Sequence, residues 1–359
     1  MVGCSAAAFL AEAGRSVTLL ESTAVAAGAS GRNSGSIQHP FDPVLLPLYL
    51  ESLATYQALA EADPGFALPT EPVGILLLTH DPDAARARAA DLATSFPELG
   101  AEALDTEALA DLEPALSSGL SAVRVSTGYP ATPDGATHAL AARAVRAGVT
   151  VRIGRTARPW VEDGRVRGAS LDDGELLSAE QVLVAGGPFT PEILGADPEW
   201  PPITRTWGVT VQIALAKAPR HILEEGVVHT VNVPTGRTGS VFSLMSVGGV
   251  STVGSTFLTD APDPETMAPQ LVARGSAFVP ALAEAPIRGI RLCARPQSVD
   301  GRPFIGPVPG VEGLFVCAGH GPWGISTGPG SAALVADLML GRADRVPPDL
   351  RADRPTGLG

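Results

Sequence analysis

The first 21 residues place a helix and a buried strand in an order that constrains the fold more than any other part of the chain. Residues 5–13 are strong helix formers, and Gly14 stands where a helix C-terminus favours a left-handed residue. A short apolar run then ends at Glu21. A helix, a glycine, a buried strand and a terminal acid form the second half of a βαβ dinucleotide-binding unit, whose acid accepts hydrogen bonds from a ribose hydroxyl.

Gly3 stands 18 residues before Glu21, at the place of the third glycine of a G-x-G-x-x-G fingerprint. The first strand and the first two glycines would precede Met1, so we expect the chain to be short here by a strand of about five or six residues. Two interpretations stay open. Either an upstream segment supplies these parts, or the helix and strand belong to an ordinary α/β unit.

A polar, glycine-rich segment at 28–35 follows the acid, with the sequence G-A-S-G-R-N-S-G. Backbone N–H groups of such a segment can bind phosphate or flavin oxygens; the alternative is a flexible linker. The segment resembles the G-x-S-x-R-N-x-G stretch of the D-amino-acid oxidase and glycine oxidase family of FAD enzymes. The resemblance implies that it runs beside the flavin. The cofactor-binding residues implied in this part of the chain are Gly3, Glu21, Ser30, Gly31, Arg32, Asn33, Ser34 and Gly35.

Helical and β patterns alternate along the rest of the chain. The helical patterns predict helices at 43–62, 81–95, 105–112, 134–148 (capped by Asp134), 267–278 and 331–340. Apolar or β-branched runs predict strands at 73–78, 149–153, 181–184, 208–215, 227–233, 240–244, 251–255 and 313–318. A hairpin is predicted at 160–171, with its turn at Asp163-Gly164.

The C-terminal third carries the most specific match to the family. Residues 295–306 resemble its R-P-x-x-x-D-G-x-P-x-I-G pattern, and a strand, a glycine loop and a helix follow. A helix N-terminus after such a loop stabilises an anion. The resemblance implies that these amides face the pyrimidine side of the flavin. It adds the cofactor-binding residues Val151, Ala185, Gly186, Gly187, Gly319, His320, Gly321, Gly324, Ile325 and Ser326.

The fold class expected is α/β, with a Rossmann-like FAD-binding domain around a parallel sheet and an α+β substrate domain with an antiparallel sheet. The length of 359 residues and a hydrophobic content of 45% fit two domains. The resemblance implies that both are discontinuous. The FAD-binding domain takes 1–40, 130–200 and 293–345, the substrate domain takes 41–129 and 201–292, and 346–359 is a C-terminal tail.

Two residues are the candidates for contact with a substrate, which the resemblance makes a small amino acid: glycine, sarcosine or a D-amino acid. A bidentate arginine is the natural clamp for a carboxylate, and Arg295 matches the family's carboxylate-binding arginine. The alternative is that Arg295 pairs with Asp300 or another acid at the domain seam. Trp323 either lines the substrate pocket or packs in the core beneath its loop. His320 is expected to hydrogen-bond near the flavin rather than act as a base.

The three cysteines, Cys4, Cys293 and Cys317, are too few and too scattered for a disulfide framework or a zinc site, which favours a reducing cytoplasm and predicts no metal. Cys293 stands seven residues before Asp300. In the related monomeric sarcosine oxidases, the cysteine that carries a covalent flavin stands seven residues before the corresponding aspartate. We expect the FAD to be non-covalent, because Arg295 matches the glycine oxidase pattern; a covalent link at Cys293 is the alternative.

The net charge of −13 opposes binding to nucleic acid or to an anionic membrane, and no apolar run reaches the length of a membrane span. The expected partner is a small-molecule substrate, with a homo-oligomer left open. The function expected is FAD-dependent oxidation of the C–N bond of a small amino acid by hydride transfer, as an oxidase or a dehydrogenase. The alternatives are a 2-hydroxy-acid oxidising flavoenzyme of the same superfamily and a non-catalytic remnant that does not hold FAD.

Overall fold

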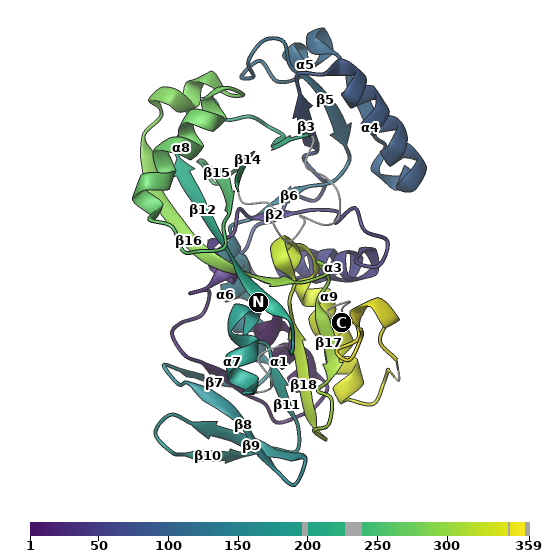
Figure 1. Cartoon of the computed structure of the whole chain (residues 1–359), viewed down its shortest axis with the longest axis vertical. Coiled ribbons are helices and arrows are strands. Elements are labelled where there is room, and N and C mark those ends of the chain that lie inside the picture. Colours follow the sequence, from purple (N-terminus) through teal and green to yellow (C-terminus); the bar gives the residue numbers. More distant parts are fainter. Residues whose placement is uncertain (196–199, 227–238, 344, 356–359) are drawn as a thin grey trace.

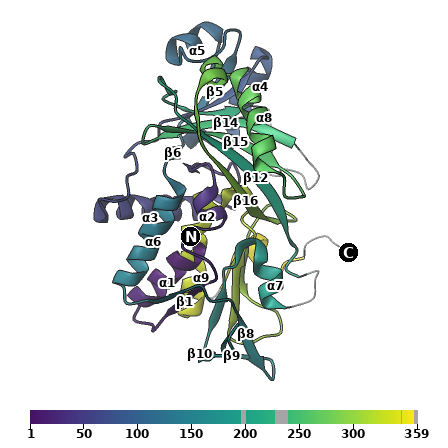
Figure 2. The same ribbon diagram turned by 90° about the vertical axis from the view of Figure 1, so that its left-hand side faces the viewer.

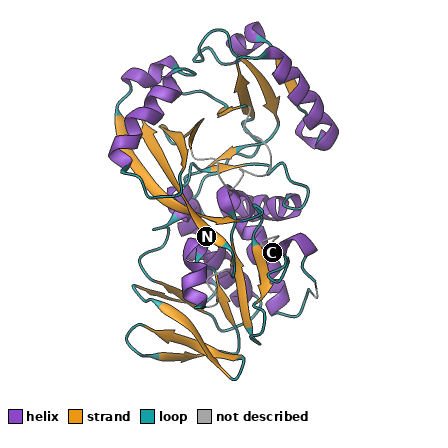
Figure 3. Cartoon of the chain, in the orientation of Figure 1, coloured by secondary structure: helices purple, strands orange, loops and turns teal. Residues whose placement is uncertain are grey.

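The computed structural model describes residues 1–195, 200–226, 239–343 and 345–355. The described chain forms two lobes that stack along the long axis of the molecule (Figure 1). Figure 3 shows that strands and helices are mixed in both lobes, with one large sheet in the upper lobe and several small sheets in the lower one. The mixed α/β class with parallel and antiparallel sheets, expected from the sequence, is confirmed.

Helices pack side by side at the centre of the lower lobe (Figure 2). The helices of this lobe are α1 (Val2–Glu12), α2 (Ala29–Arg32), α3 (Leu46–Ala62), α6 (Pro133–Arg146), α7 (Thr190–Leu194) and α9 (Gly324–Met339). One face of α1 meets α6 through Ala7 and Ala8, and another meets α9 through Ala6. The small alanine side chains allow the three helices to approach closely.

Two parallel strand pairs lie against these helices. Strand β1 (Thr18–Glu21) pairs with β7 (Thr150–Ile153), and β11 (Val182–Val184) pairs with β18 (Leu314–Ala318), which β17 (Phe304–Pro307) extends in the antiparallel sense. The remaining strands of the lobe form a meander and a two-stranded ladder: β8 (Ala157–Glu162), β9 (Arg165–Leu171), β10 (Leu176–Ser178), β2 (Ser36–Ile37) and β6 (Tyr129–Pro130). The predicted turn of the first hairpin is confirmed, since Asp163 and Gly164 both have positive φ.

An eight-stranded sheet fills the upper lobe. Its strand order is β16-β12-β15-β14-β13-β3-β5-β4, and β13 and β3 are its parallel neighbours. The strands are β3 (Ile75–Thr79), β4 (Glu102–Leu104), β5 (Ser121–Val125), β12 (Ile203–Ile213), β13 (Ile222–Glu225), β14 (Gly239–Val247), β15 (Val250–Phe257) and β16 (Ile287–Ser298). The helices of the lobe are α4 (Pro82–Ser95), α5 (Thr106–Leu112) and α8 (Pro264–Ser276). The predicted strand at 227–233 lies outside the described residues.

The two faces of the large sheet differ in chemistry. Val209, Leu223 and Val253 point to the face that α8 covers, and they pack with Leu271 of that helix in an apolar core. Successive side chains of a strand point to opposite faces, so Gly208, Glu224 and Gly254 belong to the other side. We call this the inner face. It is directed towards the lower lobe, because Arg291 of β16 donates to Asn33 O and Gln38 contacts Glu224.

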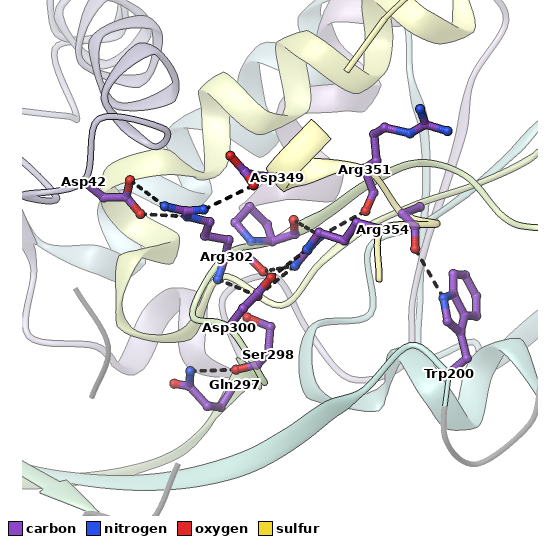
Figure 4. A network of polar contacts seen from close by, with 11 residues as sticks. Asp42, Trp200, Gln297, Ser298, Asp300, Arg302, Asp349, Arg351 and Arg354 are labelled. Atoms are coloured by element: carbon purple, nitrogen blue, oxygen red, sulfur yellow. Dashed lines mark hydrogen bonds and ion pairs between the residues drawn. The ribbon is translucent and has the colours of Figure 1, made fainter. Parts of the chain in front are cut away.

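Ion pairs tie the C-terminal segment to the lower lobe (Figure 4). Arg354 donates to both carboxylate oxygens of Asp300 at 2.7 and 2.9 Å, and its guanidinium lies 3.8 Å from the ring centre of Phe304. Arg302 donates to the fully buried Asp42 at 2.9 Å. We call these two pairs the seam.

Two predicted details of the helices are wrong. Helix α9 begins at Gly324 rather than at residue 331, and it continues through Pro329. A Cβ at Gly330 would lie 2.1 Å from Leu48 O, so glycine is needed there for α9 to cross α3. Helix α6 begins after Thr132 with Pro133 in its first turn, so Asp134 lies inside the first turn and is not the cap. Proline is favoured at the first helical position because no N–H is needed there.

Candidate active site

Glu21 ends β1, as predicted, beside Ile153 at the end of the parallel strand β7. Its carboxylate accepts the backbone N–H of Thr23 at 2.9 Å. Val151 lies on β7 and pairs with Leu19. Gly3 lies in the first turn of α1, where an added Cβ would stand 3.5 Å from Leu19 Cδ1. That distance is ordinary contact, so packing against the strand does not by itself require glycine at this position.

The segment at 28–35 is a helical turn, α2, followed by a locked loop rather than a flexible linker. Asn33 Nδ2 donates to Ala29 O and Ser30 O, and its Oδ1 accepts the N–H of Gly35 at 2.9 Å. Ser30 Oγ accepts a bond from the amino group of Met1, and Arg32 donates to Leu292 O at 3.2 Å. The loop therefore joins the start of α1 to the inner face of the large sheet.

The Ala185-Gly186-Gly187 turn follows β11, as the sequence pattern predicted. Ala185 Cβ lies 3.7 Å from a Cβ built on Gly3, so the strand end meets the start of α1. These residues and the 28–35 loop lie around the same helix N-terminus. Gly187 has a positive φ of 57°, a conformation that glycine adopts without strain.

The loop at 319–323 and the N-terminus of α9 form a second group of predicted cofactor residues. His320 is buried, and its Nε2 has no hydrogen-bond partner among the described residues. Burial, helped by the nearby positive charge of the N-terminus, lowers the pKa of His320 to about 4. The side chain is therefore neutral at pH 7. Ser326 Oγ accepts the N–H of Gln38 at 3.0 Å.

The start of α1 and the start of α9 lie together. A Cβ built on Gly328 would stand 3.4 Å from Val2 Cγ2 and 3.6 Å from Met1 Sδ. Both helices are longer than ten residues, and their N-terminal N–H groups favour negative charge. Two helix N-termini and the unpartnered Nε2 of His320 fit a flavin nucleotide, whose phosphates and pyrimidine oxygens accept hydrogen bonds.

Arg295 reaches across the inner face from β16 to β15. Its Nη1 donates to Thr256 O and its Nη2 to Ser255 Oγ, both at 2.8 Å, and its guanidinium lies 4.4 Å from the ring centre of Phe257. No described acid forms an ion pair with Arg295, and Asp300 pairs with Arg354 instead. A Cβ at Gly208 would lie 2.5 Å from the guanidinium, so glycine leaves the room that Arg295 occupies. Burial lowers the pKa of Arg295.

Trp323 and Cys293 differ in their surroundings. Trp323 is partly buried against two apolar clusters, one with Phe41 and Met245 and the other with Leu48. Cys293 is a buried free thiol on β16, opposite Gly208 and beside Arg32 O. Burial raises the pKa of Cys293. Among the described residues, no group of three or more His, Cys, Asp or Glu side chains could hold a metal ion.

Sequence reasoning missed Glu224 on the inner face and Gln38, the lower-lobe residue that contacts it. Gln38 Nε2 donates to Glu224 Oε1 at 3.1 Å, and Ser36 Oγ donates to Gln38 Oε1. Glu224 follows the apolar pair Ile222-Leu223 on β13, and an acid at the end of an apolar strand is a usable signal. Gln38 carries no such signal, because it lies in a loop next to the two-residue strand β2.

Comparisons with known proteins show the family and the fold of the chain. A family model described as FAD dependent oxidoreductase matches residues 1–338. A D-amino acid dehydrogenase of Rhizobium johnstonii is 31% identical over 305 residues, which are 80% of this chain and 70% of that protein. A glycine oxidase of Pseudomonas aeruginosa is 31% identical over 194 residues, 53% of this chain and 50% of that protein, so the match spans half the length of this relative.

Solved structures share the fold. The glycine oxidase of Bacillus cereus superposes with a TM-score of 0.81 at 24% identity and covers 96% of both chains. The iminodiacetate oxidase of a Chelativorans species superposes with a TM-score of 0.79 at 22% identity, covering 96% of this chain and 95% of its own. No described helix has the length and apolar character needed to cross a membrane.

Proposed function

Because the chain belongs to the FAD dependent oxidoreductase family, we propose that it oxidises the C–N bond of a small amino acid: glycine, sarcosine or a D-amino acid. The names of its relatives support this substrate class, since they include a D-amino acid dehydrogenase, a glycine oxidase and an iminodiacetate oxidase. The single observation that carries the proposal is Arg295, an inner-face cation whose described partners are all uncharged.

Arg295 is the residue that binds the substrate carboxylate in this proposal. Its bonds to Thr256 O and Ser255 Oγ fix the plane of the guanidinium. A carboxylate there supplies the negative charge that the buried guanidinium lacks, and a planar fork orients it through two parallel bonds. Holding the carboxylate fixes the direction of the α-C–H bond, which is the orientation that the reaction requires.

The lower lobe holds FAD, which when bound supplies the acceptor for the hydride of the substrate α-carbon. We assign Glu21 to the ribose of its nucleotide half, and we place the 28–35 loop beside the flavin. The N-terminus of α9 would lie on the pyrimidine side of bound FAD, where its N–H groups would stabilise negative charge. His320 is neutral at pH 7 because of its lowered pKa, so it serves as a hydrogen-bonding group beside the flavin. We propose that the FAD is non-covalent and that Cys293 stays a free thiol.

We further propose a Rossmann-like FAD-binding domain formed by 1–40, 130–200 and 293–345, as expected from the sequence. Helix α3 falls in the range expected for the substrate domain but packs against α9 in the lower lobe, so we add it to the FAD-binding part. The parallel pairs β1–β7 and β11–β18 support this domain. Strand β16 crosses the boundary at 293, which carries Arg295 from the substrate sheet towards the FAD-binding part. Three free cysteines support a reducing cytoplasm as the location.

Reduction of the flavin in the absence of oxygen tests the proposal directly. Purified holoprotein is mixed with glycine, sarcosine, D-alanine or 2-hydroxyglutarate, and the visible flavin absorbance is followed. We expect bleaching by at least one amino acid and none by the hydroxy acid. Bleaching by 2-hydroxyglutarate alone assigns the protein to hydroxy-acid oxidation, and a protein that binds no FAD contradicts the proposal. Acid precipitation tests the linkage, since non-covalent FAD stays in the supernatant.

A further inference from the structure

Two adjacent acids on β13 face opposite sides of the large sheet and differ in their partners. Glu225 points to the side of α8, where its carboxylate accepts bonds from Arg274 and from the N–H of Phe242. Glu224 points to the inner face, where Gln38 Nε2 is its hydrogen-bond donor. No described arginine, lysine or histidine forms an ion pair with Glu224. One acid is therefore neutralised within the fold, whereas its neighbour has no charged partner among the described residues.

Glu224 is held in place by residues of the lower lobe. Gln38 is buried and both ends of its amide form hydrogen bonds, because Nε2 donates to Glu224 while Oε1 accepts from Ser36 Oγ. The backbone N–H of Gln38 in turn donates to Ser326 Oγ, in the first turn of α9. Glu224 is thus joined through one residue to the helix N-terminus assigned to the flavin. A carboxylate fixed in this way costs little additional ordering when a ligand binds.

Small side chains lie between Glu224 and Arg295 on the inner face. Ser243 stands opposite Glu224 in the β13–β14 ladder, and Gly254 stands opposite Ser243 in the β14–β15 ladder. A Cβ built on Gly254 would lie 3.1 Å from Thr210 Cγ2 and 3.4 Å from Ser243 Oγ, which places these residues on one face. Thr210 Oγ1 is buried without a hydrogen-bond partner among the described residues. These residues would form a small, polar floor for a ligand.

The separation of the two charged groups suits a ligand of a few carbon atoms. Arg295 donates to residues of β15, and Glu224 lies on β13, which is two strands away. Neighbouring strands are about 4.8 Å apart, so the groups are separated by roughly 10 Å. The α-ammonium of an amino acid is too close to its carboxylate to reach both. An ammonium at the end of a stem like that of lysine is long enough.

We propose that Glu224 is a specificity-determining residue that binds the cationic side chain of a D-amino-acid substrate whose carboxylate is held by Arg295. This inference rests on the proposed function and narrows its substrate class to basic D-amino acids. Burial raises the pKa of Glu224 to about 7, and an ammonium group in contact would favour the ionised carboxylate. The ammonium group of the ligand thus supplies a positive charge to pair with Glu224, as the guanidinium of Arg274 does for Glu225.

Binding to the reduced holoenzyme tests the proposal without turnover. The flavin is first reduced with dithionite under anaerobic conditions, and calorimetry then measures the dissociation constants of D-lysine and D-norleucine, which have the same chain length but differ in the ammonium group. We expect D-lysine to bind about tenfold tighter or more, because a charge-assisted hydrogen bond is gained. Glu224→Gln removes that preference, and the matched control Glu225→Gln on the other face keeps it.

Equal binding of the two ligands by the wild-type protein overturns the proposal, and so does a preference that survives in Glu224→Gln. If Glu224→Gln does not fold, Nε-acetyl-D-lysine replaces the variant. It should bind the wild-type protein as weakly as D-norleucine, and tight binding overturns the proposal. The two claims fail separately. Flavin reduction by D-alanine without a preference for D-lysine removes this inference alone. A preference for D-lysine without flavin reduction by any amino acid removes the proposed function, and Glu224 is then a binding residue for a cationic ligand that is not a substrate.

Discussion

The seam and the inner face of the large sheet both contain buried or partly buried arginines, but the arginines of the two regions differ in the charge of their partners. At the seam, Arg354 and Arg302 each donate to an aspartate, and Arg354 also donates to three backbone carbonyls (Figure 4). On the inner face, Arg295 donates to a carbonyl and a hydroxyl, and Glu224 accepts from an amide. Charges that are paired within the fold hold segments together, whereas charges left with neutral partners are available to a ligand.

Arg295→Met gives the largest expected effect on activity, because it removes the cation and keeps much of the side-chain volume. We expect kcat/KM for the amino-acid substrate to fall by about thirtyfold to several thousandfold, the range for loss of one partner of a buried charge pair. The free energy of unfolding should change by about 1 kcal/mol or less, since two hydrogen bonds to neutral groups are lost and a buried charge is relieved. Steady-state kinetics and urea denaturation measure the two.

Gly208→Ala is the control that keeps the charge but displaces it, because the added Cβ would lie 2.5 Å from the guanidinium. Its loss of kcat/KM should fall between those of the wild-type protein and Arg295→Met. Full activity in both variants would exclude Arg295 from substrate binding.

Arg354→Met should have the opposite effect to Arg295→Met, lowering stability and leaving activity unchanged. It removes the guanidinium that donates to Asp300 and to three carbonyls, while Asp300 keeps the backbone N–H of Arg302 as a donor. We expect a loss of about 3 kcal/mol of unfolding free energy, at the low end for a broken buried pair because Asp300 also keeps some access to water. The catalytic constants per folded molecule should stay those of the wild-type protein. Urea denaturation measures the loss, and Arg86→Ala serves as the control. Arg86 forms an exposed pair with Asp83, so its removal should change stability by about 0.5 kcal/mol or less.

The smallest expected effect is the dependence of stability on pH at the seam. Burial opposes ionisation of Asp300, but the bonds and charge of Arg354 outweigh it and hold the pKa of this carboxyl below its usual value. A depressed carboxyl pKa stabilises the fold above the unfolded pKa of about 3.9, and this contribution is lost as pH falls through the folded pKa. Denaturation at a series of pH values below 6 should show a shallower acid loss for Asp300→Asn than for the wild-type protein.

Local patterns predicted the elements that depend on local chemistry. The helix at the start of the chain, the strand ending at Glu21 and the turn at Asp163-Gly164 all follow from propensity and periodicity. The start of α9 did not, because Gly328-Pro329-Gly330 reads as a helix breaker. The helix nevertheless continues through these residues, because they allow α9 to cross α3 closely and Ser52 Oγ accepts the N–H of Gly330 at 2.8 Å. Tertiary contacts decide such boundaries, and a single sequence does not contain them.

The candidate site also depends on tertiary contacts that the sequence alone does not reveal. Arg295 was identified by its motif, and the structure adds that Asp300, the alternative partner, is engaged by Arg354. Glu224 was missed because its meaning depends on strand alternation and register. Only these show that Glu225 faces Arg274 while Glu224 faces Gln38. The spacing of the two acids in the sequence is one residue, which carries no information about the partner of either.

The contact between α1 and α9 has a consequence for synthesis of the protein. Helix α1 covers residues 2–12, and one of its partners covers residues 324–339. At about 5–20 residues per second, the second helix is made roughly 15–60 s after the first. During that interval α6 can cover Ala7 and Ala8, but the residues of α9 that pack against Ala6 are not yet made. The apolar side of α1 that packs on α9 therefore lacks this contact until translation nears its end.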